Sequence, residues 1–303
     1  MAGMSHKRIL RYTLVGSVAL GSFIAGTYFE RKKLWPSQFQ LNDLRYLLSA
    51  ATAFSPVASE NNVSRVSQIM KYGFPGLDNI RSFDDFVLSY DRRNRVAHWV
   101  FEHLTAERIK KNDEVDRSKC DFKQDESIHL FFRSQNSDYK GSGYDRGHLA
   151  AAGNHKFHQK HIEQTFVLSN MAPQVGKGFN RDSWNRLEKH VRRLTKHYTN
   201  VYCCTGPLYL PRREADGKNY VKYEVIGANH VAVPTHFFKV VVGETSDQKL
   251  EMEAYVMPNQ IIDDNVPLSS FQVPPESIER AAGLLFFDNV SRKQFSKING
   301  KKS

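Results

Sequence analysis

Cysteine is scarce in this sequence. Its 303 residues contain three cysteines, Cys120, Cys203 and Cys204, and two of these are adjacent. Adjacent cysteines are sterically unsuited to an ordinary bridge, so a disulfide framework is excluded and we expect three free thiols. No CxxC pair accompanies the histidines, and the sequence therefore gives little support to a structural zinc site.

Long hydrophobic runs are also missing. The nearest approach is the uncharged segment of 17 residues from Thr13 to Phe29, which is at the lower limit for a membrane span. Lys7, Arg8 and Arg11 precede it, and no acidic residue occurs before Glu30. This pattern is typical of a targeting segment. A cleaved presequence, a transient inner-membrane anchor and a secretory signal all fit it.

Acidic residues are in the minority. The chain has 32 Asp and Glu against 43 Lys and Arg, for a net charge of +11, and such a surplus attracts polyanions. Residues 1–50 hold seven basic and two acidic side chains, so +5 of the excess lies there and about +6 elsewhere. A hydrophobic content of 40% with 12% aromatic residues suffices for a packed core, and the length fits one domain plus a leader.

The most informative stretch that is present runs from Tyr144 to Ala150, with the sequence YDRGHLA. A second one, NRDSWNRLE, follows from Asn180 to Glu188. Hydrolysis of a phosphodiester needs a base for water, a cation for the phosphate charge and commonly a metal for the leaving oxygen. His148, Arg146 and Asn180 are suitable groups for these three tasks.

Local structure supports this interpretation. Trp184, Leu187, Val191, Leu194 and Tyr198 follow one another at steps of three and four, which predicts an amphipathic helix. Asn180 and Asp182 are the candidate caps of this helix. From its start, Asn180 can present an amide oxygen to a hard cation, and Glu188, about two turns along, can hold a metal-bound water.

Each residue alone has a plainer interpretation. An isolated Arg-Gly-His tripeptide is common, Asn180 alone is a helix cap, and Glu188 alone is a solvated carboxylate. Trp184 and Leu187 alone are core residues. The order and the spacing of the whole set favour a hydrolase.

These residues resemble the DNA/RNA non-specific endonuclease family, and its mitochondrial branch in particular. The resemblance covers roughly Met70 to Phe287. Besides Asp145-Arg146-Gly147-His148 with Asn180 and Glu188, it includes Cys120-Asp121-Phe122, Gly141-Ser142-Gly143, Leu168 to Gln174, Thr205 to Leu208 and Val231 to His236.

The resemblance implies a ββα-metal motif and a role for each site residue. His148 resembles the general base, and Asn180 resembles the single direct protein ligand of Mg²⁺, with Mn²⁺ as an alternative ion. Glu188 resembles the acid that orients metal-bound waters. Arg146 resembles a phosphate contact, and Asn170, grouped with the catalytic residues, resembles a polar residue that supports the site. Asp145 is assigned no chemical step.

The implied activity is metal-dependent hydrolysis of DNA and RNA with little sequence specificity, leaving 5′-phosphate and 3′-hydroxyl ends. The implied setting is the mitochondrial intermembrane space, with transient membrane contact through the N-terminal segment and relocation to the nucleus in cell death. The implied partners are a second copy of the chain and an inhibitor protein. Alternatives are a nucleic-acid-binding protein without hydrolysis, an enzyme for other phosphodiesters, or a nuclease held inactive by a partner.

Basic residues beside the motif are candidates for the substrate track. A run of charge is usually only a solvated face; the alternative for these residues is contact with phosphate, and for Phe179 it is stacking on a base. The candidates are Lys156, Lys160, Lys177, Arg181 and Arg186.

The expected fold class is α+β, with a central antiparallel sheet flanked by helices. We expect a targeting segment with linker at 1–60, an endonuclease domain at 61–290 and a frayed basic tail at 291–303. A second helix is expected near Pro275 to Ala282. The predicted strands are Arg95–Glu102, Ile128–Arg133, Val201–Leu208, Tyr223–Ile226, Val231–Val242 and Leu250–Met257.

Overall fold

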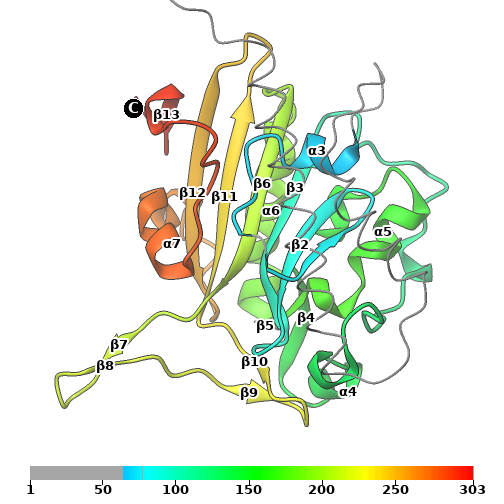
Figure 1. Ribbon diagram of the computed structural model, residues 1–303, viewed down its shortest axis with the longest axis vertical. Helices are drawn as coiled ribbons and strands as arrows, with labels where there is room; N and C mark the ends of the chain where they lie inside the picture. Colours follow the sequence, from blue (N-terminus) through cyan, green and yellow to red (C-terminus); the bar gives the residue numbers. More distant parts are fainter. Residues whose placement is uncertain (1–63, 77, 303) are drawn as a thin grey trace, which may run out of the picture. The chain divides into compact units, whose positions relative to one another are not determined.

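The fold is built on one large twisted sheet (Figure 1). The computed structural model describes residues 64–76 and 78–302. Eight strands follow the order β1-β2-β3-β6-β11-β12-β13-β14. Their bounds are β1 Ile80–Ser82, β2 Phe86–Asp91, β3 Val96–Leu104, β6 Asn200–Leu208, β11 His236–Glu244, β12 Leu250–Pro258, β13 Phe295–Ile298 and β14 Lys301–Lys302. Neighbours pair antiparallel except β12 and β13, which confirms the α+β class with a mostly antiparallel sheet.

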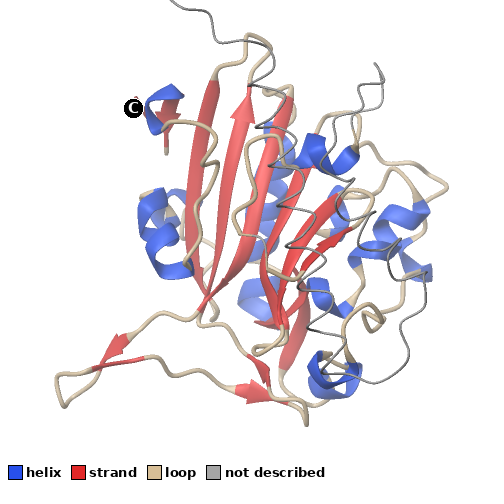
Figure 2. Ribbon diagram, viewed as in Figure 1, coloured by secondary structure: helices blue, strands red, loops and turns tan. Residues whose placement is uncertain are grey.

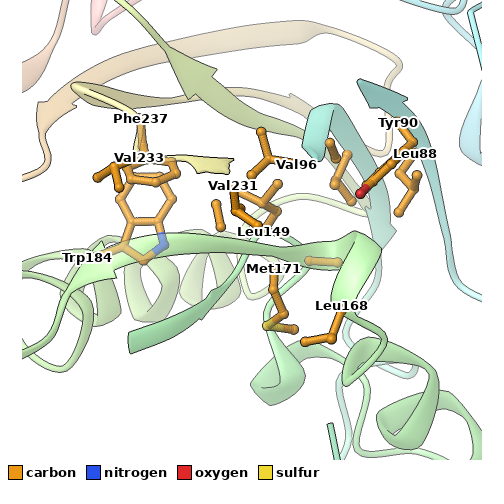
Figure 3. Close-up of a cluster of buried hydrophobic side chains, with 14 of the residues drawn as sticks. Leu88, Tyr90, Val96, Leu149, Leu168, Met171, Trp184, Val231, Val233 and Phe237 are labelled. Carbon is orange, nitrogen blue, oxygen red and sulfur yellow. The ribbon is translucent and has the colours of Figure 1, made fainter. Parts of the chain in front are cut away.

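The central strands are buried on both faces. Eight consecutive residues of β6 and of β11 are buried, which suits their near-continuous apolar sequences. Phe237 on β11 faces one core with Trp184, and its neighbour Phe238 faces the other with Phe286. Figure 3 shows the first of these cores. Fully burying one such side chain stabilises the fold by about 1.5–3 kcal/mol.

Helices lie against the sheet and beside it, as Figure 2 shows. The predicted amphipathic helix is α6, Ser183–Leu194, and it buries Trp184, Leu187 and Val191 as expected. The second predicted helix is α7, Pro275–Ala282, which ends at Gly283 in the left-handed conformation typical of a C-terminal cap. The shorter helices are α3 Arg65–Ile69, α4 Asn136–Tyr139 and α5 Gln159–Thr165.

A separate two-stranded unit leads into α6. Strand β4, Tyr144–His148, pairs antiparallel with β5, Met171–Val175, and His148 lies opposite Met171. The irregular turn η5, Gly176–Asn180, joins β5 to α6. Two strands followed by a helix form the ββα motif that the resemblance implied.

Short turns and an arm complete the structure. Single helical turns are η1 Arg117–Lys119, η2 Leu130–Phe132, η3 Ala152–Asn154, η4 Leu168–Asn170, η6 Leu268–Phe271 and η7 Arg292–Gln294. The small strands are β7 Arg212–Arg213, β8 Asn219–Tyr220, β9 Val225–Ile226 and β10 Val231–Ala232. The segment that carries β7, β8 and β9 extends away from the sheet as an arm (Figure 1).

Several strand predictions are confirmed and others are wrong. Strands β3, β6 and β12 lie where they were expected. The segment Ile128–Arg133 instead forms the turn η2 with Leu130 and Phe131 exposed, because it has no neighbouring strand to pair with. In the segment Tyr223–Ile226 only the last two residues form a strand. The segment Val231–Val242 is divided into β10 and β11, with Pro234 between them.

The C-terminal tail is not frayed. Residues of β13 pair in parallel with β12, and Phe295 is buried on the core behind that strand. The expectation of a frayed tail is therefore wrong, because two apolar residues among the lysines suffice to anchor it at the sheet edge.

The predicted targeting segment lies outside the described residues. Within 64–76 and 78–302, no helix combines the length and the apolar character that a membrane span needs. The three cysteines are free and buried, as their spacing predicted.

Candidate active site

A cavity of about 1050 Å³ opens at the ββα motif, and its lining is strongly basic. Seven Lys or Arg residues line it against two acids, which gives its walls a formal charge of +5. The basic residues are Arg117, Lys140, Arg146, Lys156, Arg181, Lys189 and Arg192, and the acids are Asp145 and Glu188. Such a surface attracts a phosphate backbone.

Asp145 and Asn180 are held together across the cavity floor. The Asn180 Nδ2 group donates to Asp145 Oδ2 at 2.9 Å, although the two residues are 35 positions apart. Because the carboxylate only accepts, it sets the direction of the amide and leaves the Asn180 Oδ1 atom for another ligand. The sequence alone assigned Asp145 no role, and this contact supplies one.

Arg181 binds the same carboxylate. Its Nε and Nη2 atoms donate to Asp145 at 2.8 and 2.5 Å. Burial opposes the charge on Asp145, but the hydrogen bonds from Arg181 and Asn180 outweigh it and hold the pKa of Asp145 below its usual range. Gly176 packs directly against this carboxylate, since a Cβ there would lie 3.0 Å from each Asp145 oxygen.

His148 ends β4 and lines the cavity. Its ring packs edge-on against Phe166, with centroids 4.7 Å apart, and no residue of the described chain forms a hydrogen bond with Nε2. Burial, together with the positive charges of Arg117 and His155, lowers the pKa of His148 to about 3. The imidazole is therefore neutral at pH 7, with a lone pair on one ring nitrogen.

Glu188 lies on α6, on the wall of the cavity. Burial raises its pKa, while the charges of Lys239 and Arg192 act in the opposite direction. Lys239 is a buried lysine on β11; its Nζ donates to Thr205 Oγ1 at 2.7 Å and lies 4.9 Å from the centre of the Trp184 ring.

Arg146 enters the cavity over an aromatic ring. Its guanidinium carbon lies 4.0 Å from the centre of the Phe122 ring, and its Nη1 donates to Asn136 Oδ1 at 2.7 Å. The ring and the amide restrict the rotamers of the arginine, so its charge is held in place before a substrate arrives.

Asn170 does not line the cavity. It is fully buried, where its Oδ1 accepts from the Ala150 nitrogen at 2.9 Å and its Nδ2 donates to the carbonyls of Ala150 and Thr165. These bonds fix the backbone two residues after His148. The placement of Asn170 among the catalytic residues is corrected to a positioning role, because a side chain buried in backbone contacts cannot touch a substrate.

Only some of the basic residues predicted to contact the substrate line the cavity. Lys156 and Arg181 line the cavity, although Arg181 is paired with Asp145. Lys177 and Arg186 are outside it; Arg186 donates to the carbonyls of Asp264 and Val266, so its expected phosphate contact is contradicted. Two further candidates also lie outside the cavity lining, and for Lys160 the phosphate contact stays a prediction. Lys160 pairs with Asp84, and Phe179 is fully buried, which excludes stacking on a base.

Sequence reasoning missed several cavity residues. Arg117 lies on η1, well before the motif, and Arg192 and Lys189 follow Glu188 on α6. The helical period could have indicated Arg192, since it lies four positions after Glu188 and therefore on the same face. For Arg117 the sequence carries no local signal.

The donor set fits a hard divalent cation with few protein ligands. No cluster of three or more His, Cys, Asp or Glu side chains arranged for metal binding occurs in the described part of the chain. Mg²⁺ usually keeps several waters and uses one or two protein oxygens with the substrate phosphate. The free Asn180 Oδ1 in a cavity that also holds Glu188 fits that requirement.

Comparison with known proteins decides the family. The family model described as DNA/RNA non-specific endonuclease matches residues 65–293 of this chain. The chain belongs to the DNA/RNA non-specific endonuclease family. This assignment confirms a nuclease and a hydrolase, and the family is metal-dependent.

Relatives within this endonuclease family place the chain more closely. It is 57% identical to endonuclease G, mitochondrial, of Caenorhabditis elegans over 239 residues, covering 79% of this chain and 78% of that protein. It is 56% identical to endonuclease G, mitochondrial, of Homo sapiens over 223 residues, covering 74% of each chain. The predicted resemblance to the mitochondrial branch is confirmed, and with it the mitochondrial localisation.

A solved structure supports the fold of this endonuclease. The crystal structure titled as the EndoG/EndoGI complex, on the mechanism of EndoG inhibition, matches with a TM-score of 0.79 and 74% identity. The match covers 81% of this chain and 99% of the other.

Proposed function

We propose that this nuclease cleaves DNA and RNA by Mg²⁺-assisted attack of water, with His148 as the general base. The observation that carries the proposal is the pair formed by Asp145 and Asn180, which frees one amide oxygen in a cavity shared with His148. A neutral imidazole and a directed amide oxygen are the two groups that this reaction requires of the protein.

His148 accepts the proton. Its neutral ring takes a proton from water as the water oxygen forms a bond to phosphorus and the bond from phosphorus to the 3′ oxygen breaks. The departing 3′ oxygen takes a proton from a second water molecule, and His148 returns its proton to solvent, so the products are a 5′ phosphate and a 3′ hydroxyl. Because the nucleophile is water, the reaction needs no 2′ hydroxyl, and DNA and RNA are both substrates.

Asn180 is the direct protein ligand in this proposal, and Glu188 binds through water. When bound, Mg²⁺ supplies positive charge at the scissile phosphate and the leaving oxygen. Mn²⁺ accepts the same oxygen ligands and is the alternative ion. Asp145 orients the Asn180 amide, and Glu188 accepts hydrogen bonds from water that enters the cavity.

The cationic walls hold the phosphate backbone. We assign the stabilisation of the transition-state charge to Arg146, Arg117 and Arg192. One guanidinium group can donate two parallel hydrogen bonds to a phosphate. Lys156 extends the positive surface. Contacts of this kind read the backbone and not the base edges, which agrees with low sequence specificity.

The test is cleavage by the purified full-length protein. Wild type, His148→Ala and Asn180→Ala are incubated with supercoiled DNA and single-stranded RNA over a series of Mg²⁺ and Mn²⁺ concentrations, and the ends are tested for a ligatable 5′ phosphate. We expect metal-dependent cutting by wild type alone. Full activity of His148→Ala would contradict the base assignment. Binding without cutting under any metal would favour the binding protein or a nuclease awaiting release.

We also propose that the chain forms a homodimer and is restrained by an inhibitor protein. The arm exposes Val221, Tyr223 and Val225, and solvent-exposed apolar residues of this kind favour protein contacts. The solved relative is titled as a complex with its inhibitor. Sedimentation of wild type beside Val221→Asp tests the dimer.

We further propose that the protein resides in the intermembrane space, contacts the membrane transiently and relocates to the nucleus. A reporter fused to residues 1–60 tests the first two of these proposals.

A further inference from the structure

A buried chain of hydrogen bonds runs from the central sheet to the wall of the cavity. It starts at Glu102 on β3, whose side chain is 0% exposed. The Glu102 Oε1 atom accepts from Asn154 Nδ2 at 2.8 Å and pairs with His155 Nε2 at 2.9 Å. At the other end, Arg192 Nη1 donates to Asn154 Oδ1 at 2.9 Å.

A carboxylate at this depth is costly, so its retention requires compensation. Moving a charge out of water is unfavourable unless the charge is paired and hydrogen-bonded. His155 provides the pairing. Burial by itself lowers the pKa of His155, but its contacts with Asp85 and Glu102 outweigh burial and raise it, which favours the cationic ring. The Glu102 Oε1 atom thus contacts both Asn154 Nδ2 and His155 Nε2, while Oε2 has no hydrogen-bond partner among the described residues.

The direction of the Asn154 amide follows from that acceptor. Glu102 accepts hydrogen bonds and donates none, so the Asn154 Nδ2 group faces the sheet and its Oδ1 atom faces the cavity wall. Arg192 meets this oxygen. A Cβ atom on the neighbouring Gly153 would lie 2.9 Å from Arg192 Nη1, so the guanidinium passes close to the backbone at this glycine.

Arg192 is thus held at one end and available at the other. It lies one turn after Glu188 on α6, and both line the cavity. Its Nη1 is committed to Asn154, while Nε and Nη2 form no hydrogen bond with another residue in the described part of the chain. A planar guanidinium held at one nitrogen has a defined orientation for its remaining donors.

We propose that Asn154 and Glu102 are positioning residues that orient the Arg192 guanidinium toward the scissile phosphate. The inference rests on the proposed nuclease function. His148 and Asn154 lie on the same short segment. Asn170 forms hydrogen bonds with the backbone of Ala150, which lies between them, and so restrains the segment that carries both side chains.

A double-mutant cycle on the full-length chain tests this. We would measure kcat and KM on a fluorescent duplex at saturating Mg²⁺ for wild type, Asn154→Leu, Arg192→Ala and the double variant. Misplacing one charged group in an active site lowers rates by about tenfold to a hundredfold. We expect Asn154→Leu to lower kcat by such a factor with little change in KM. In the Arg192→Ala background, the same substitution should lower kcat less than twofold further.

Two more variants separate positioning from folding and from charge. Asn200→Leu is the matched control, because Asn200 also bridges a carboxylate, Glu244, and a ring nitrogen, that of His103, and it lies away from the cavity. We expect it to keep wild-type kcat. Arg192→Lys keeps the charge without the fork, needs no buried substitution and should lose nearly as much activity as Arg192→Ala.

The outcomes distinguish the inference from the proposed function. Losses that multiply in the double variant, wild-type activity of Asn154→Leu, or wild-type activity of Arg192→Lys would each overturn the positioning role. None of these results affects the proposed mechanism with His148 as the general base, which His148→Ala tests. If Asn154→Leu does not fold, Arg192→Lys still decides between a held guanidinium and a diffuse charge.

Discussion

The Asn180 side chain donates its amide hydrogen to Asp145 at 2.9 Å, and this contact determines which atom of Asn180 faces the cavity. The same carboxylate binds Arg181 through two nitrogens. If Asn180 is the metal ligand that we propose, its affinity for the ion should fall when the residue that orients its amide changes.

Replacement of Asp145 by Ala should raise the Mg²⁺ concentration needed for half-maximal cleavage by about 10- to 100-fold, because the Asn180 amide is then free to rotate. Activity at saturating Mg²⁺ should fall less. The measurement is initial rate against Mg²⁺ concentration. Asp216→Ala removes an exposed carboxylate on the arm and serves as control. An unchanged metal requirement would contradict the orienting role.

On the acid side, the dependence of kcat/KM on pH should not show the decrease near pH 6.5 that an ordinary histidine base would cause. Burial, with the charge of Arg117, lowers the pKa of His148 to about 3, so at pH 5 roughly 1% of this ring is protonated, against about 97% at a pKa of 6.5. Between pH 7 and 5, kcat/KM should therefore not decrease through His148. A kcat/KM profile that falls with a midpoint close to 6.5, and a fall that is absent from the residual activity of His148→Ala, would contradict the lowered pKa of His148 in the free enzyme.

The same kind of shift should appear in stability. Burial lowers the pKa of His103 to about 4, so the unfolded chain binds its proton first as the pH falls. The contribution is fully present above pH 6.5 and is lost between about 6.5 and 4, with a maximum of about 3 kcal/mol. Urea unfolding from pH 7.5 to 4 measures it. The variant His103→Gln should show a shallower decrease; an equal decrease would rule His103 out as the cause.

Substitution of Gly147 should destabilise the motif. A Cβ atom on Gly147 would lie 2.0 Å from Gln174 Oε1 and 2.2 Å from Cδ, and Gln174 is buried on the opposite strand β5. We expect Gly147→Ala to lower the free energy of unfolding by about 1–3 kcal/mol, as overpacking does. Shortening the opposing side chain in Gly147→Ala/Gln174→Ala should recover part of the loss. Additive losses in the double variant would show that the contact is not the cause.

Two arginines that look alike in the sequence should differ in effect. Arg117 lines the cavity, so Arg117→Ala should lower kcat/KM by about tenfold or more and reduce the salt dependence of binding. Arg186 is bound to the carbonyls of Asp264 and Val266, so Arg186→Ala should cost about 1 kcal/mol of stability and leave kcat/KM nearly unchanged. Comparable catalytic losses in the two variants would contradict this division.

Local signals in the sequence sufficed for much of the fold. Helix α6 follows from the spacing of Trp184, Leu187 and Val191, because a helix brings positions three and four apart onto one face. Strand β6 follows from its mostly apolar sequence, and strand β12 follows from the alternation of apolar and polar residues at its start. The segment Ile128–Arg133 was misjudged, since a strand also needs a neighbour with free hydrogen-bonding groups, and that neighbour is set by the chain far away.

The sequence by itself determined the family and the order of the residues to which we assign the base, the metal ligand and the acid: His148, Asn180 and Glu188. Only the tertiary structure decided which side chains are free to act. It turned Arg186 toward a loop, enclosed Asn170 in backbone contacts and brought Asp145 to Asn180. The physical reason is that helix and strand periodicity depend on neighbours in the chain, whereas the partner of a polar side chain depends on which distant backbone or carboxylate lies within about 3 Å of it after folding.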